Sequence, residues 1–341
     1  MTISAVIPAF NRRNHVSRAI DSALAQTVPV DEILIIDDGS TDGTAELVES
    51  RYGSRVRVVR QANSGVAGAR RRGVQEAHGT WVAFLDSDDE WLPDRNSELL
   101  WAAQHVPADV AWIFGALRIV TDKGEGLTLF EEHGLVIRES PHVFADSLEI
   151  QYPYQFPMLQ ASLIRRDALL ELNCFSEGLR SDDDLLAGFQ IACCYKFAAI
   201  PSVVGRYFRT SDLAASSVVV NGNFGPDYHR SRILAFERVI QSGRRRPWNH
   251  HYASSVRALC QTLARRGTHV RPLAWQQFRY GGLSTKGIAF LGAAILGLWA
   301  LRAWDWSAEF ARRYRNSATR TPIKENGLGA YFESLYRKSD R

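Results

Sequence analysis

The sequence has little cysteine and no pattern that would pair it. Its 341 residues include 4 Cys, none of them in a C-x-x-C pair, and Cys193 and Cys194 are adjacent, which is poor geometry for a mutual disulfide. We therefore expect reduced core cysteines in a cytosolic protein. The first residues enter an apolar strand at once, which predicts a chain without a signal peptide.

Two glycine patterns of nucleotide-binding proteins are also missing. No G-x-G-x-x-G follows the first apolar run, and no G-x-x-x-x-G-K-[ST] occurs anywhere. These patterns shape the phosphate-binding turns of dinucleotide-binding folds and phosphate-loop NTPases, so both classes are disfavoured. A sugar-phosphate nucleotidyltransferase is disfavoured as well, because PAFNRRN offers no glycines for a triphosphate loop after that first run.

Long apolar runs are absent too. The uncharged run Gly287–Leu301 has 15 residues, fewer than the ~20 that a membrane-spanning helix needs. Lys286 and Arg302 flank this run. Two interpretations stay open: an ordinary packing helix, or a helix that lies in the membrane interface beside anionic lipid.

Acidic residues are scarce in the last third of the chain. Residues 226–341 carry 21 Lys+Arg against 7 Asp+Glu, whereas residues 1–225 carry 20 against 30. A basic region either solvates its own helices or faces an anionic surface. We predict a domain over residues 1–225, with halves 1–95 and 96–225, and a basic helical region over residues 226–341 that contacts the membrane. No nucleic-acid partner is expected.

Apolar runs and helical patterns alternate through the first 95 residues. Strands are expected at residues 3–7, 32–36, 56–59 and 81–85, with helices at 14–26, 41–51 and 66–77 between them. This alternation predicts an α/β fold with a mainly parallel, doubly wound sheet. Ligands bind beyond the carboxyl ends of such strands. Polar clusters stand there at residues 8–11, 37–40 and 86–89, and we expect them to converge.

Further along the chain the pattern predicts three more features. A hairpin is expected from residues 110–120 and 126–130 around the turn at 122–124. An apolar helix follows the acids at 182–184, and two short strands surround Pro201.

The acids after the fourth predicted strand carry the strongest chemical signal. Asp86, Asp88 and Asp89 follow the apolar run directly. Carboxylates crowded at a strand end repel one another, and a hard divalent cation such as Mg²⁺ or Mn²⁺ relieves that repulsion. Taken alone, the same acids also suit a solvated turn that caps the next helix.

Four blocks together resemble family 2 glycosyltransferases with the GT-A fold, a Rossmann-like sheet flanked by helices. They are VIPAFNR (Val6–Arg12), EILIIDDGSTDGT (Glu32–Thr44), NSGVAGARRRG (Asn63–Gly73) and FLDSDDEWLPD (Phe84–Asp94), in the family's order. The resemblance implies an inverting, metal-dependent, hexosyltransferase-like enzyme that uses a nucleoside-diphosphate sugar, most often a UDP-sugar.

The resemblance also implies roles for individual residues. The loop at Pro8, Ala9 and Phe10 would lie against the nucleobase, and Asp38 would contact it. Arg70 would lie near the nucleotide, although Arg71 replaces the asparagine that the family has next to it. Asp86 would face the ribose and Asp88 would bind the metal, with Asp86 as a second candidate ligand and Asp89 as a support. From the residues alone, Asp37 or Asp38 could instead cap the helix that begins near Thr41.

A second acidic cluster resembles the family's E-D-x-D-L-W stretch, which supplies the catalytic base. Aligning Asp184 with the D of the D-L pair places Asp182 at the base, with Asp183 as the alternative. Ser181 and Leu186 replace the family's glutamate and tryptophan. The helix dipole is a sufficient structural reason for two of the three acids.

The resulting hypothesis is a glycosyltransferase that moves a sugar to a hydroxyl of a glycan or lipid-linked acceptor. It would be cytoplasmic, attached peripherally to the inner face of the membrane, and would serve polysaccharide or cell-envelope synthesis. The alternative, motivated by Ser181 and Leu186, is a non-catalytic nucleotide-sugar or glycan-binding protein on the same fold.

Overall fold

A computed structural model describes residues 1–151, 157–175, 183–211, 233–236 and 239. The chain divides into two units, Met1–Val220 and Asn221–Arg341, and the account below concerns the first. The basic region 226–341 and the run Gly287–Leu301 lie almost wholly outside the described residues, so the predictions made for them stay predictions. Within the described part, no helix has the length and apolar character needed to cross a membrane.

The first half of the unit is a parallel sheet of four strands. In spatial order these are β3 (Arg57–Arg60), β2 (Glu32–Asp37), β1 (Ile3–Ala9) and β4 (Trp81–Phe84). β1 and β4 are buried along their whole length, as expected for strands covered on both faces. The four predicted strands are thus confirmed, with bounds that differ by one or two residues.

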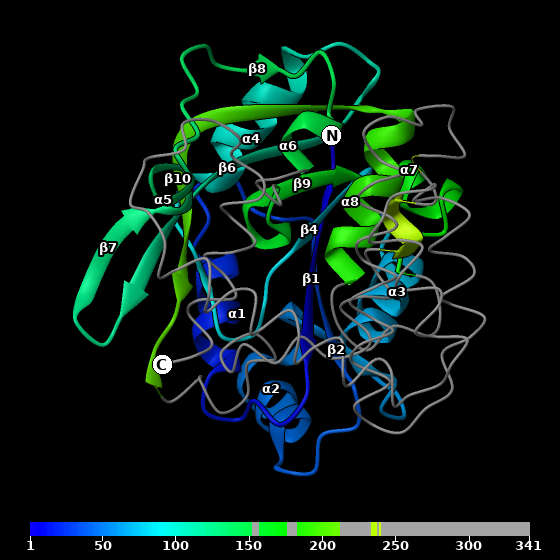
Figure 1. Cartoon of the computed structure of the whole chain (residues 1–341). Coiled ribbons are helices and arrows are strands. Elements are labelled where there is room, and N and C mark those ends of the chain that lie inside the picture. The colour runs from blue at the N-terminus through cyan, green and yellow to red at the C-terminus, as the bar shows by residue number, and fades with distance from the viewer. Residues whose placement is uncertain (152–156, 176–182, 212–232, 237–238, 240–341) are drawn as a thin grey trace, which may run out of the picture. The chain divides into compact units, whose positions relative to one another are not determined.

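Three helices connect these strands. They are α1 (Val16–Leu24), α2 (Thr44–Tyr52) and α3 (Gly65–Glu76), and α1 and α3 lie on either side of β1 (Figure 1). α3 packs closely on β1 because Gly73 has no side chain there: a Cβ at this position would lie 2.2 Å from Val6 Cγ1. A short 3₁₀ turn, η1 (Gly53–Arg55), links α2 to β3.

The sheet then becomes mixed. Beyond β4 the order continues with β9 (Ser162–Arg165), β6 (Val110–Thr121), β10 (Lys196–Phe208) and β5 (Glu90–Trp91). β9 runs antiparallel to both β4 and β6, whereas β10 and β6 are parallel. β7 (Gly124–Thr128) pairs with β6 as the predicted hairpin, which projects away from the sheet in Figure 1. β8 (His142–Val143) pairs with β10.

Two details differ from the sequence-based expectation. The two short strands predicted around Pro201 form one strand, β10, because irregular register between Ala199 and Val203 accommodates the proline without ending the pairing. The last residues predicted for the hairpin belong to α5 (Leu129–His133), because Thr128 and Glu131 form a reciprocal capping box that starts a helix there.

The remaining elements cover the second half of the sheet. They are α4 (Arg95–Gln104), α6 (Leu148–Gln151), η2 (Leu159–Ala161), α7 (Arg166–Glu171) and α8 (Asp183–Cys194). Cys174 is a buried, reduced thiol, as predicted, whereas Cys194, the last residue of α8, is a reduced thiol that is exposed and does not belong to the core. Cys260 lies outside the described residues.

Candidate active site

The loops after β1 and β2 are joined to each other at the carboxyl edge of the sheet. Asn11, in the left-handed region at φ 53°, donates its backbone N–H to Ser40 Oγ at 2.9 Å and accepts from the Thr41 N–H at 2.9 Å. The first strand runs further than predicted, because Pro8 and Ala9 are buried residues of β1 and not part of the loop, whereas Phe10 after them is 45% exposed. Phe10 therefore presents an aromatic surface at this edge.

Asp38 is buried at the end of β2 and points to the start of α3. Its Oδ1 accepts from the Ser64 N–H at 2.9 Å and from Gln61 Nε2 at 2.7 Å, and its Oδ2 accepts from the Gly65 N–H at 2.8 Å. The prediction that Asp37 or Asp38 caps the helix near Thr41 is wrong. That helix, α2, begins at Thr44, whose N–H Asp42 accepts at 3.0 Å, and Asp38 stabilises α3 instead.

Arg70 joins the two acidic motifs that the sequence separates by almost a hundred residues. From the middle of α3, its Nη1 donates to both oxygens of Asp183, at 2.9 and 3.0 Å, and its Nη2 donates to Asp86 Oδ1 at 2.9 Å. Burial alone would lower the Arg70 pKa, but Asp183, Asp86 and Asp184 raise it above its ordinary value. Arg70 is therefore a permanent buried cation among carboxylates.

Asp88 faces two arginines of the α1 region. Arg12 Nη2 lies 3.8 Å from Asp88 Oδ2, and the Arg18 guanidinium donates to the Asp88 backbone carbonyl while it stacks on the Phe208 ring at 3.7 Å. Burial, followed by the charge of Asp86, raises the Asp88 pKa. The charges of Arg12 and His15 work in the opposite direction, but they do not cancel the effect of burial and of Asp86.

Asp89 holds the turn that carries these acids. It is buried, its Oδ1 accepts from the Phe208 N–H at 3.0 Å and its Oδ2 accepts from Gln160 Nε2 at 2.9 Å. Burial and the charges of Asp86 and Asp88 raise its pKa well above the ordinary value. The contacts agree with the supporting role expected for Asp89, since both oxygens are used within the protein.

The predicted base lies at the edge of what the structure describes. Asp182 is outside the described residues, and its alternative, Asp183, is the first residue of α8, with both oxygens bound by Arg70. Among the described residues, no group of three or more His, Cys, Asp and Glu side chains is placed to hold a metal ion by itself.

Several side chains at this edge were not singled out from the sequence. Arg12 stands in the VIPAFNR block but received no role, and Arg18 and Gln160 carry no local signal. Gln160 and Asp89 are 71 positions apart in the sequence, and the pairing of β4 with β9 brings their side chains within hydrogen-bond distance. Arg209, directly after β10, forms two hydrogen bonds to Glu132, at 2.8 and 3.0 Å.

Known proteins resemble both the sequence and the fold. The family described as glycosyl transferase family 2 matches residues 4–172. The succinoglycan biosynthesis protein ExoO of Rhizobium meliloti is 32% identical over 211 residues, 59% of this chain and 58% of that protein. The chondroitin synthase of Pasteurella multocida is 45% identical over 94 residues, 27% of this chain and 10% of that protein. The chain thus spans less than two thirds of these relatives.

Among solved structures, residues 1–349 of S. aureus TarS in complex with UDP give a TM-score of 0.60 at 17% identity, covering 96% of this chain and 95% of that one. The same protein with UDP-GlcNAc gives a TM-score of 0.57 at 17% identity, covering 86% and 79%. Likeness at this identity concerns the fold, which is that of GT-A glycosyltransferases.

Fold, motif order and family match agree on the class of protein. The fold is the α/β arrangement of GT-A enzymes, with acids gathered at the carboxyl edge of its parallel strands. The chain belongs to glycosyl transferase family 2.

Proposed function

We propose that this protein is an inverting glycosyltransferase that moves a sugar from a nucleoside-diphosphate sugar to a hydroxyl of a glycan or lipid-linked acceptor. The observation that carries the proposal is the contact of one side chain, Arg70, with both Asp86 and Asp183. It brings the D-x-D acids and the residue next to Asp182 to one place. UDP-sugars are the first donors to test, since TarS was solved with UDP and with UDP-GlcNAc.

The donor would lie along the carboxyl edge of β1, β2 and β4. Phe10 is exposed there to meet the base, and the Pro8–Phe10 backbone offers further contacts. Asp38 supports this loop region, and its Oδ2, which accepts one hydrogen bond from Gly65, retains capacity to accept from a base N–H. Arg12 and Arg18 place positive charge near Asp88 for the diphosphate.

The side chains present fit a divalent cation. Asp88, with Asp86, supplies oxygen donors that repel each other, and Mg²⁺-like ions take one or two carboxylates and complete their shell with phosphate and water. A bound Mn²⁺ or Mg²⁺ would offset charge on the diphosphate leaving group, worth several kcal/mol. This arrangement needs no cage of three protein ligands.

Asp182 is proposed to accept the proton of the acceptor hydroxyl as its oxygen attacks the anomeric carbon from the face opposite the diphosphate. A positioned base contributes ~10²–10⁴-fold to the rate. Asp183, with both oxygens on Arg70, is less able to accept that proton, which favours Asp182. The proposal also includes a glycan or lipid-linked acceptor and contact of the basic region 226–341 with the membrane surface.

The test is release of UDP from labelled UDP-sugars with Mn²⁺, with and without candidate acceptors. Asp182→Asn should leave calorimetric UDP affinity nearly unchanged and lower turnover ~10²–10⁴-fold. Asp109→Asn, on the far side at an exposed pair with Lys196, is the matched control and should turn over normally. Tight UDP binding without any UDP release by the unaltered protein would favour the non-catalytic binding protein, and near-normal turnover by Asp182→Asn would refute the base.

A further inference from the structure

Arg70 links α3 to α8, and among the residues that the structure describes no backbone hydrogen bond joins these two helices. The Arg70 side chain extends from α3 and donates hydrogen bonds to Asp86, which follows β4, and to Asp183 in the first turn of α8. The Arg70 and Asp183 side chains are 8% and 1% exposed, whereas Asp86 is 30% exposed. One end of this bridge is therefore sealed in the protein, and the other end is open to a ligand.

The sealed end has the geometry of an anchor. Both Asp183 oxygens accept from one guanidinium nitrogen, at 2.9 and 3.0 Å, so the carboxylate is fixed in distance and in orientation. A buried charged pair of this kind is costly to break from one side only, because the partner is left as an uncompensated buried charge. The first turn of α8 thus has a defined position relative to α3.

The open end lies within the proposed donor site. Asp86 accepts from Arg70 through Oδ1 at 2.9 Å, and its partial exposure leaves the rest of the carboxylate accessible. A donor or cation that engages Asp86 therefore meets a group already fixed by Arg70. Since Arg70 also fixes Asp183, the donor end and the start of α8 share one rigid connection.

We propose, building on the function proposed above, that Arg70 is a positioning residue. Through its paired contacts with Asp86 and Asp183, it sets the first turn of α8 relative to the donor, and the first residue of that turn directly follows the proposed base Asp182 in the sequence. In this role Arg70 does not bind the nucleotide, which revises the contact that the family resemblance implied, and Asp183 is an anchor and not the base. Displacing a catalytic group by about 1 Å costs ~10²-fold in rate, so loss of the anchor should affect turnover more than binding.

Asp183→Asn is the decisive variant, because it keeps the Arg70–Asp86 contact. We expect kcat to fall 10- to 100-fold, while the Kd for UDP with Mn²⁺ changes less than about threefold. The acid limb of the kcat–pH profile should keep its position, since the base is untouched. Loss of that limb would make Asp183 the base and would overturn the proposal.

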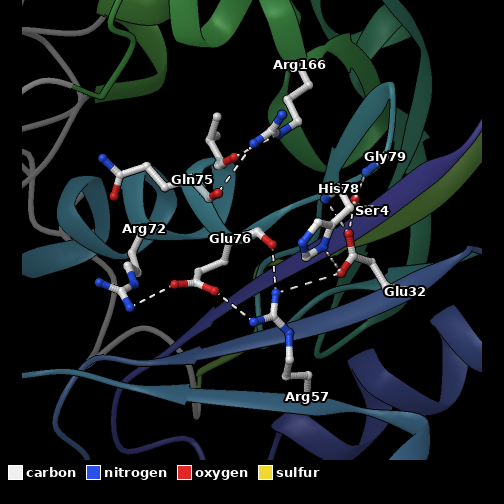
Figure 2. A network of polar contacts seen from close by, with 10 residues as sticks. Ser4, Glu32, Arg57, Arg72, Gln75, Glu76, His78, Gly79 and Arg166 are labelled. Atoms are coloured by element: carbon white, nitrogen blue, oxygen red, sulfur yellow. Dashed lines mark hydrogen bonds and ion pairs between the residues drawn. The ribbon is translucent and has the colours of Figure 1, made fainter.

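Arg70→Lys separates positioning from nucleotide contact. Lysine keeps the charge but cannot form the forked contact with two carboxylates, so kcat should fall by a much larger factor than UDP affinity. A rise in the Kd for UDP as large as the fall in kcat would show that Arg70 binds the nucleotide. The matched control is Arg72→Met, on the same helix in an exposed pair with Glu76 (2.8 Å, Figure 2), which should change neither quantity.

Hydrogen–deuterium exchange gives a readout that needs no turnover. In Asp183→Asn and Arg70→Lys, peptides covering the first turn of α8 should exchange at least about tenfold faster than in the unaltered chain, while β1 peptides stay protected. Unchanged exchange at α8 would refute the anchor. An unaltered protein that binds no nucleotide sugar would refute the proposed function instead, so the two failures are distinguishable.

Discussion

The two edges of the parallel sheet carry ionic networks of opposite character. Figure 2 shows the network at the amino edge. It is built around two glutamates, Glu32 at the start of β2 and Glu76 at the end of α3. Arg57 donates to Glu76 Oε2 at 2.7 Å and lies 3.8 Å from Glu32. Glu32 also accepts from the His78 N–H at 2.6 Å. Each glutamate here has more than one cationic or N–H partner.

At the carboxyl edge the balance is reversed. The carboxyl-edge cluster contains five acids. Asp86, Asp183 and Asp184 act on the buried Arg70, whereas Asp88 lies 3.8 Å from Arg12 and Asp89 is influenced by the charges of Asp86 and Asp88. Burial, and then the charge of neighbouring acids, raises the pKa of Asp88, Asp89 and Asp184. The ionised form of these carboxylates is therefore disfavoured, and protonation or a further cation nearby would stabilise them.

The pKa shifts separate the two edges. Burial works to raise the Glu32 pKa, but hydrogen bonds from Ser4 and His78 outweigh it and lower the pKa; a hydrogen bond from Arg57 lowers that of Glu76. The amino edge is thus satisfied within the protein and stabilises the fold. At the carboxyl edge the pKa of Asp88, Asp89 and Asp184 is raised, and such raised values are common where a ligand or metal completes a site. The contrast predicts that neutralising Asp88 at the carboxyl edge and neutralising Glu32 at the amino edge change the free energy of unfolding with opposite signs.

The largest effect should come from Asp88→Asn. Turnover should fall about 100-fold or more, because the metal–diphosphate contact is worth several kcal/mol. The ligand-free protein should meanwhile become more stable, by up to about 1 kcal/mol, since a carboxylate with a raised pKa destabilises the fold at neutral pH. Calorimetry with UDP, with and without Mn²⁺, and urea unfolding measure the two quantities. If Asp88→Asn were less stable than the unaltered protein and still bound UDP in a Mn²⁺-dependent manner, both the predicted gain in stability and the metal role of Asp88 would be wrong.

The opposite signature is expected from Glu32→Gln. Its hydrogen bonds from Ser4 and His78 lose their charge assistance, so the free energy of unfolding should fall by about 1–1.5 kcal/mol. Turnover and UDP affinity should not change, because Glu32 lies at the far edge. Glu49→Gln, in an exposed pair with Arg60, is the control and should have little effect on stability. Altered kinetics in Glu32→Gln would show that the edges are coupled.

Local patterns were enough to predict the first half of the fold. The four strands predicted within residues 1–95 are short runs separated by periodic helices, and all four were confirmed. β1, β2 and β4 are buried parallel strands, which an apolar run marks clearly, whereas the two-residue strand β5 (Glu90–Trp91) was missed because it carries no such run. The meeting of the polar clusters after β1 and β2 followed from strand order alone. β10 was divided wrongly, since the register irregularity that carries Pro201 depends on its neighbour β6.

Contacts between distant segments could not be predicted in the same way. Arg70 and Asp183 are 113 positions apart, and nothing near either residue indicates the other. Asp38 was placed on the wrong helix because α2 and α3 both begin near its strand end, and only the fold shows that Ser64 and Gly65 come closer. The roles of Asp88 and Asp182 stay predictions, since they concern bound partners and a residue outside the described part.

The smallest effect concerns the pH dependence of the amino edge. A carboxylate whose pKa is lower in the folded state than its ordinary 4.5 stabilises the fold above about pH 4.5, and this stabilisation is lost as the pH falls through the folded-state pKa. The stability gap between the unaltered protein and Glu32→Gln should therefore be constant from pH 7 to pH 5. Below pH 4.5 it should narrow to within about 0.5 kcal/mol, because a protonated Glu32 resembles glutamine. Urea unfolding across this range measures the gap. A gap that persists unchanged in acid would mean that the Glu32 contacts act through packing and not through charge, and the electrostatic contrast between the two edges would then rest on the carboxyl edge alone.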